Sequence, residues 1–203
     1  MRDKWYADKR DLVKWSGIMH ILDNKRLGIQ KVFQIAYYRQ TDWPLLDFNG
    51  IDIEIPEKVL QHFRDIRLIK QLDPRIEVFN QYFDHKDRKR YVNNVCEMLR
   101  ERNEKKIVFL DPDTGLEPSV CEVEHVKREE IGKIFNTLKQ GDFLVFYQHK
   151  FWNPKWDEIR LSELAEACGL SESKINTWKA DKIANDVVFF FVKKEDSYSG
   201  NEI

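Results

Sequence analysis

Residues 106–118, with the sequence KIVFLDPDTGLEP, decide the fold that we predict for this chain. The segment opens with a continuous apolar run, which is typical of a strand buried on both faces of a parallel sheet. Turn-forming residues follow directly, beginning with Asp111, Pro112 and Asp113. Ligands of open α/β sheets bind beyond the carboxyl ends of the strands, so the two carboxylates are candidate site residues. A turn aspartate can instead serve only to accept backbone N–H bonds, and this segment alone leaves both interpretations open.

Helical and extended patterns alternate along the chain on both sides of this segment. Apolar residues at helical spacing predict helices at residues 8–25, 56–69, 85–103, 126–140 and 156–168. Apolar, β-branched and aromatic runs predict strands at residues 31–38, 76–83, 106–111, 142–148, 175–180 and 187–192. The alternation predicts an α/β fold with one Rossmann-like, mostly parallel sheet and helices on both faces. We expect a single domain over residues 1–203, in which residues 195–203 form a frayed tail.

Composition narrows the class of protein. A chain of 203 residues is long enough for one domain with a substantial core. Its 34 Lys and Arg residues nearly balance 35 Asp and Glu residues, so the overall charge does not indicate a nucleic-acid binder. The widely spaced Cys96, Cys121 and Cys168 argue against a zinc site or a disulfide framework. Without a signal-peptide core or an apolar run of about 20 residues, we expect a cytoplasmic protein with no membrane segment.

Two local features keep alternatives open. The cluster HKDRKR at residues 85–90 begins a predicted helix, where it is either a solvated face or a surface for phosphate groups. Residues 39–55 show no sustained period and contain Asn49 and Gly50, so we predict a loop with one short hairpin. The oligomeric state cannot be predicted from these patterns.

Two segments resemble a known family. YADKRDLVKW at residues 6–15 is similar to the opening motif of the large-subunit ribosomal RNA adenine-N6 methyltransferases, and FLDPDTGLEP at residues 109–118 resembles their DPPY-type motif. The resemblance implies a methyltransferase-type sheet, in which the terminal strand at residues 187–192 runs antiparallel. It also implies S-adenosylmethionine as cofactor and an amino group of RNA or DNA as the methyl acceptor.

The resemblance assigns roles to particular residues. Lys14 on the first helix would help to hold the cofactor, with Asp11 on the same helix and Tyr37 near the end of the first predicted strand as further cofactor-binding candidates. Asp111 would meet the target amine, because methyl transfer to an amine requires in-line positioning and an acceptor for the amine protons. Asp113 and His149 are further catalytic candidates, since both lie at or beyond strand ends that share one edge of a parallel sheet. We therefore expect Asp111, Asp113, His149 and Lys14 to converge on one pocket.

Departures from the family pattern support two other classes. The glycine-rich loop expected after the first strand is missing, and the aromatic residue of DPPY is replaced in DPDT. A non-catalytic descendant that binds a nucleotide or a partner is therefore one alternative. A Mg²⁺-dependent nuclease is the other, because acidic residues are spaced along the segment that follows Asp113, namely Glu117, Glu122 and Glu124, with Lys127 next.

Overall fold

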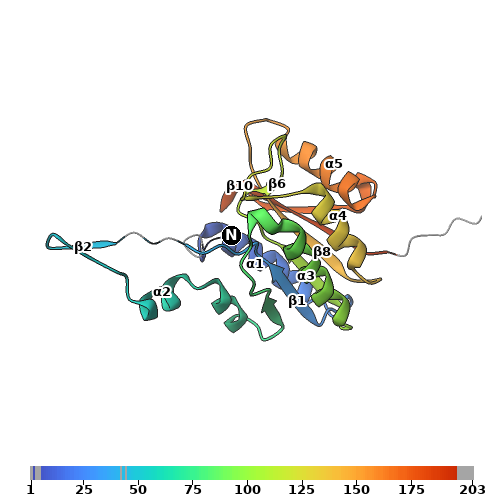
Figure 1. Cartoon of the computed structure of the whole chain (residues 1–203). Helices are drawn as coiled ribbons and strands as arrows, with labels where there is room; N and C mark the ends of the chain where they lie inside the picture. The colour runs from blue at the N-terminus through green and yellow to red at the C-terminus, as the bar shows by residue number, and fades with distance from the viewer. Residues whose placement is uncertain (1, 3–5, 42, 44, 196–203) are drawn as a thin grey trace, which may run out of the picture.

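The computed structural model describes residues 2, 6–41, 43 and 45–195, and these form one α/β unit around a central sheet (Figure 1). The helices are α1 Lys9–Leu22, α2 Glu57–Arg64, α3 Arg88–Glu101, α4 Arg128–Thr137 and α5 Trp156–Cys168, with short 3₁₀ turns at Ile66–Gln71, His85–Asp87 and Glu172–Lys174. The main strands are β1 Lys31–Ile35, β4 Ile76–Val78, β5 Lys106–Leu110, β8 Phe143–His149, β9 Asn176–Ala180 and β10 Ala184–Lys193. Two small pairs are β2 Leu46–Phe48 with β3 Ile51–Ile53, and β6 Gly115–Leu116 with β7 His125–Val126.

The six main strands lie in the order β4-β1-β5-β8-β10-β9. The first four pair in parallel, whereas β10 pairs antiparallel with both β8 and β9. The predicted mostly parallel sheet with an antiparallel terminal strand is therefore confirmed. The reversed strand lies between β8 and β9, so it is an internal strand and not the edge of the sheet.

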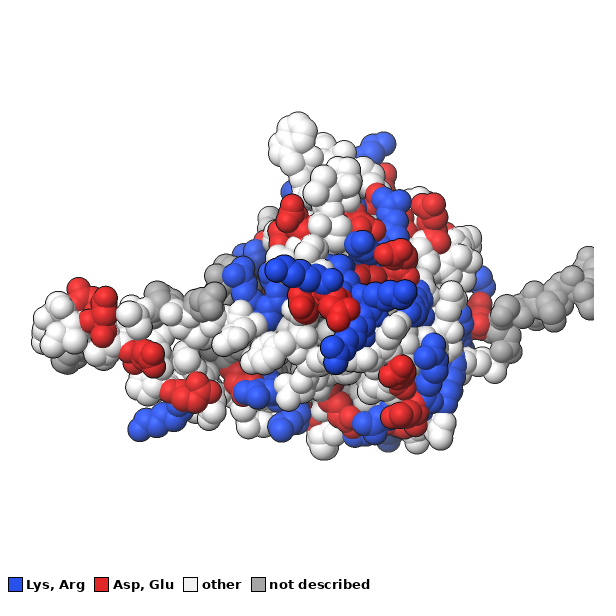
Figure 2. All heavy atoms as spheres, in the orientation of Figure 1, with Lys and Arg blue, Asp and Glu red and all other residues white. Residues whose placement is uncertain are grey.

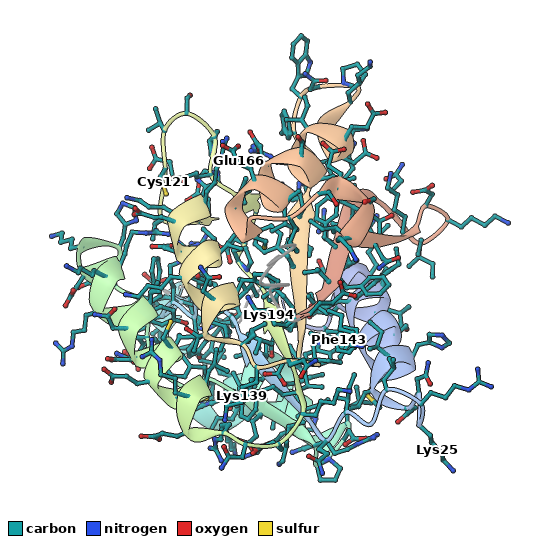
Figure 3. All side chains as sticks on the ribbon, turned by 90° about the vertical axis from the view of Figure 1, so that its right-hand side faces the viewer. Lys25, Cys121, Lys139, Phe143, Glu166 and Lys194 are labelled. Carbon is teal, nitrogen blue, oxygen red and sulfur yellow. The ribbon has the colours of Figure 1, made fainter. Side chains whose placement is uncertain are left out.

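Helices cover both faces of the sheet, as the apolar run of β5 predicts. Ile107 and Phe109 contribute to a core under α1, whereas Val108 and Leu110 contribute to a core under α3, α4 and α5. Figure 3 shows α1 on one side of the sheet and α3 and α4 on the other. All five residues of β5 are buried, which explains why this strand shows no alternation of apolar and polar residues.

The segment between β1 and β4 differs from its prediction. The predicted helix at 56–69 is divided, because Asp65 adopts an extended conformation and its side chain accepts a hydrogen bond from the backbone N–H of Arg67. The predicted strand at 76–83 pairs only over Ile76–Val78. The predicted hairpin forms β2 and β3, and it projects away from the sheet (Figure 1). Asn49 and Gly50 both have positive φ, as a two-residue hairpin turn requires.

The predicted loop at residues 111–125 contains the small parallel pair of β6 and β7. The amide side chain of Gln148 on β8 holds this pair, since its oxygen accepts from the N–H of Leu116 at 2.9 Å and its nitrogen donates to the carbonyl of Thr114 at 3.1 Å. Gly115 makes this approach possible: its φ is 119°, and an added Cβ would lie 2.3 Å from the Gln148 oxygen. The loop is thereby fixed to the sheet beside Asp111.

No described helix has both the length and the apolar composition needed to cross a membrane. The predicted frayed tail, apart from residue 195, lies outside the described residues.

Candidate functional site

A cavity of about 390 Å³ opens at the carboxyl ends of β5 and β8, beside the start of α1. Five of the predicted site residues line it, namely Asp11, Lys14, Asp111, Asp113 and His149. The four side chains expected to converge, those of Asp111, Asp113, His149 and Lys14, thus line one cavity, and their roles there remain predictions. They come together because parallel strands end at the same edge of the sheet and α1 begins beside that edge.

Lys14 lies between two carboxylates at the bottom of the cavity. Its Nζ is 2.6 Å from an oxygen of Asp11 and 2.9 Å from the carboxylate of Asp111. The amide of Gln34 on β1 donates a second hydrogen bond to Asp111 at 2.7 Å. Lys14 is 3% exposed and Asp111 is 1% exposed, so this group is shielded from water. A buried charge is tolerated only when it is paired and hydrogen-bonded, and these contacts meet that condition.

The same contacts determine how the buried groups titrate. Burial alone would lower the pKa of Lys14, but Asp111 and Asp11 outweigh burial and raise that pKa above its ordinary value. Burial raises the pKa of Asp111 and outweighs the opposing effect of Lys14, and Asp11 raises it further. The lysine therefore stays charged, and Asp111 takes up a proton at a higher pH than an ordinary aspartate does.

Asp113 belongs to a more accessible part of the cavity. Arg39, which follows β1, donates a hydrogen bond to its carboxylate, and Arg2 lies 4.0 Å away. Burial alone would raise the pKa of Asp113, but neighbouring cationic groups, Arg39 among them, lower it overall. Asp113 is therefore a charged carboxylate at neutral pH, with 10% of its side chain exposed.

His149 lies at the end of β8 on another wall of the cavity. Its Nε2 is 3.4 Å from the carboxylate of Asp186, and its Nδ1 is 3.0 Å from the carbonyl of Lys150. Arg10 on α1 binds the same Asp186 at 2.5 Å and also binds Asp8 at 3.0 Å. These contacts join the start of α1 to β8 and to the reversed strand β10.

Tyr37 does not belong to this site, which corrects the expectation that it contacts a cofactor. Its side chain is 2% exposed and packs in the core against Phe83 and Tyr91, with ring centroids 5.1 and 5.3 Å away. Tyr37 has a φ of 47°, so the chain makes a left-handed turn after β1 without a glycine. A positive φ, which glycine adopts most readily, thus follows β1 at Tyr37, and the side chain of Tyr37 faces the core.

Sequence reasoning missed several residues of the site. Gln34 carried a usable signal, because a polar side chain within an apolar strand must find a partner when it is buried. No comparable sequence signal pointed to Arg10, Arg39 or Asp186. Charged residues in turns or at the surface are common, and the partners of these three residues are distant in sequence. The acidic residues considered for a nuclease do not form a metal centre. Among the described residues, no three His, Cys, Asp or Glu side chains are grouped so that they could hold a metal ion.

No protein-family model and no curated protein matches this chain. The fold and the site define the class of protein: a Rossmann-like α/β domain with a charged cavity at the carboxyl edge of its parallel strands.

Proposed function

We propose that this chain is an S-adenosylmethionine-dependent methyltransferase that acts on an amino group of a nucleic acid. The observation that supports the proposal is the place of the cavity, at the carboxyl ends of β5 and β8 in a sheet whose reversed strand lies beside β8. Its volume of about 390 Å³ falls within the usual range for small-molecule sites. The two segments that resemble adenine-N6 methyltransferases both contribute to this cavity.

The lining residues suit the charges of S-adenosylmethionine, which supplies an activated methyl group when it is bound. Arg10 would hold the carboxylate of the cofactor, and Asp8 would hold its ammonium group. Both side chains line the cavity, and about 30% of each is exposed. The carboxylates of Asp113 and Glu124 would balance the positive sulfonium group, because opposite charges attract strongly in a partly desolvated site.

The acceptor amine needs partners for its protons, and the accessible end of the DPDT turn offers them. Asp113 and Pro112 both line the cavity, and their carboxylate and backbone carbonyl oxygens would accept such hydrogen bonds. Asp111 takes a different part in this proposal. Because its oxygens already bind Lys14 and Gln34, it acts as a positioning residue that fixes the turn and the lysine.

Calorimetric titration with S-adenosylmethionine tests the first half of the proposal. We expect saturable binding to the parent protein and at least about tenfold weaker binding to Arg10→Gln, which is a loss of about 1.4 kcal/mol. Arg75→Gln is a matched control, because Arg75 also pairs with two aspartates and lies outside the cavity. The absence of binding to the parent, or equal binding by both variants, would contradict the proposed site.

Methyl transfer from labelled cofactor to total RNA or DNA tests the second half. We expect transfer by the parent and a loss of about 10²-fold or more in Asp113→Asn, as when one transition-state contact is removed. Asp111→Asn should lower transfer and thermal stability together, because Asp111 holds Lys14. If Asp113→Asn retains full transfer, Asp113 has no catalytic part.

A non-catalytic binding protein is the second candidate, and one observation favours it. Lys14, Arg10 and Arg39 already pair with carboxylates of the protein itself, so the cavity is electrostatically satisfied without a ligand. Cofactor binding without transfer to any acceptor would favour this candidate over the methyltransferase.

A further inference from the structure

A second concave surface lies where α3 and α4 begin, and we call it the basic groove. It encloses about 550 Å³, and its cationic residues are Lys86, Arg88, Lys89, Lys127 and Lys133, against two carboxylates. Figure 2 shows Lys and Arg side chains over α3 and α4 with Asp and Glu side chains among them, and within the groove itself the cationic side chains are the more numerous. The groove is therefore positive, although the whole chain has a formal net charge of −1.

The floor of the groove is held by a buried ion pair. Arg88 donates to both oxygens of Glu130 at 2.7 Å and to the carbonyl of His125 at 2.8 Å. Glu130 also accepts from the N–H of Lys127 at 3.0 Å, at the first turn of α4. Such bidentate pairing fixes the geometry of both helix starts, so the groove keeps its shape without a ligand.

The lysines at the rim remain available to a ligand. Lys86 and Lys89 are exposed, and neither takes part in the ion pairs found among the described residues. The 14-residue helix α3 begins at Arg88 without a side-chain cap from Asp87. The positive end of its dipole therefore adds to the field of these lysines, which favours anionic groups.

The basic groove adjoins the cavity described above. Glu124 lines the cavity and Lys127 lines the groove, and only two residues separate them. Consecutive Cα atoms are about 3.8 Å apart, so the Cα atoms of Glu124 and Lys127 are at most about 11 Å apart.

We propose that the basic groove binds the phosphate backbone of a single-stranded nucleic acid and places one of its bases at the cavity. The part of this proposal that places a base at the cavity rests on the proposed function. A single strand is required because a base must leave its stack before its amino group can enter a pocket. The groove suits a strand rather than a membrane surface, because it is concave and Val92, its apolar residue, is only 2% exposed.

Fluorescence anisotropy with a labelled single-stranded RNA of about 16 nucleotides tests the groove directly. We expect the parent to bind, and Lys86→Ala/Lys89→Ala to bind about tenfold more weakly or worse. The slope of log K against log salt should fall by about 0.7 for each lysine that contacts a phosphate. Both lysines are exposed, so these substitutions should leave the melting temperature unchanged.

Lys25→Ala/Lys70→Ala is the matched control, because both lysines are exposed and lie outside the groove. Lys25 lies near the end of α1, on the other side of the sheet from α3 (Figure 3). An equal loss of binding in both double variants would overturn the proposal that the groove binds a nucleic acid. A parent protein that does not bind the labelled RNA would overturn it as well. Binding to phosphatidylserine vesicles without binding to RNA or DNA would also overturn it. Cofactor binding is measured separately, so its failure counts against the proposed function and not against the groove.

Discussion

Lys14 shows how one side chain can organise a site that no local pattern reveals. Its charge is buried, and the carboxylates that neutralise it come from its own helix and from the turn after β5. The desolvation of an ammonium group is costly, so the lysine fixes the distance between α1 and that turn. The partner at Asp111 is 97 residues away in the sequence.

Lys14→Met should destabilise the protein by about 3–5 kcal/mol, because it leaves two carboxylates buried without their cation. The free energy of unfolding in urea measures this loss. Lys9→Met is the matched control on the exposed face of the same helix, and its effect should stay within about 0.5 kcal/mol.

A double-mutant cycle separates the contact from general damage to α1. In Lys14→Met/Asp111→Asn the loss should be smaller than the sum of the two single losses, because the second change removes one uncompensated charge. Additive losses would mean that the two residues do not interact.

At the scale of single residues, prediction from sequence succeeded where topology alone decides position. Asp111, Asp113 and His149 could be placed at one edge because strand ends coincide in a parallel sheet. Tyr37 could not be placed correctly, since the direction of its side chain depends on a positive φ that propensities do not reveal. Arg39 could not be assigned to Asp113, because pairing between two turns depends on their three-dimensional path.

Among the secondary-structure elements, α4 and α5 lie in close contact at Gly132. A Cβ at this position would lie 2.6 Å from the backbone oxygen of Ala167 on α5. The contact is with backbone, which cannot rotate away as a side-chain end can. The glycine is therefore retained for packing, despite its cost within a helix.

Gly132→Ala should lower stability by about 1–3 kcal/mol, because the helices must separate to admit the methyl group. Without this clash, replacing glycine by alanine within a helix would stabilise the protein by about 1 kcal/mol. A loss of stability therefore indicates the clash with α5, and a gain indicates its absence. Thermal unfolding measures the change in stability. Asn136→Ala on the exposed side of α4 is the control and should change stability little. A Gly132→Ala protein as stable as the parent would show that α5 can move to admit the methyl group without a loss of stability.

Element prediction was most accurate for the long, strongly periodic segments. The helices α1, α3, α4 and α5 all lie within their predicted ranges, because each buries an apolar stripe against the sheet. The region between β1 and β4 was predicted less well, since its structure depends on turn chemistry at Asp65 and Asn49 rather than on periodic burial.

Over the whole molecule, the β2–β3 hairpin stands apart from the two cores (Figure 1). Leu46, Ile51 and Ile53 are 45%, 64% and 40% exposed, so they add little to the burial that stabilises the fold. An isolated two-stranded hairpin is itself only marginally stable in water. The domain should therefore fold without it.

Replacing residues 46–53 by Asn-Gly tests this independence. Leu46 and Ile53 are paired, so a two-residue turn can join their neighbours. We expect the melting temperature to change by less than about 2 °C, since about 1 kcal/mol corresponds to about 2–4 °C for a chain of this size. A fall of more than about 4 °C would mean that the hairpin packs against the domain.

The internal place of β10 in the sheet has a consequence for synthesis on the ribosome. Residues 184–193 emerge after every other strand of the sheet, yet they lie between β8 and β9. Until they emerge, the nascent chain presents the open edge of β8, which is a template for pairing with other chains. The interval between the emergence of β8 and that of β10 is thus the one in which the sheet is most open to pairing with other chains.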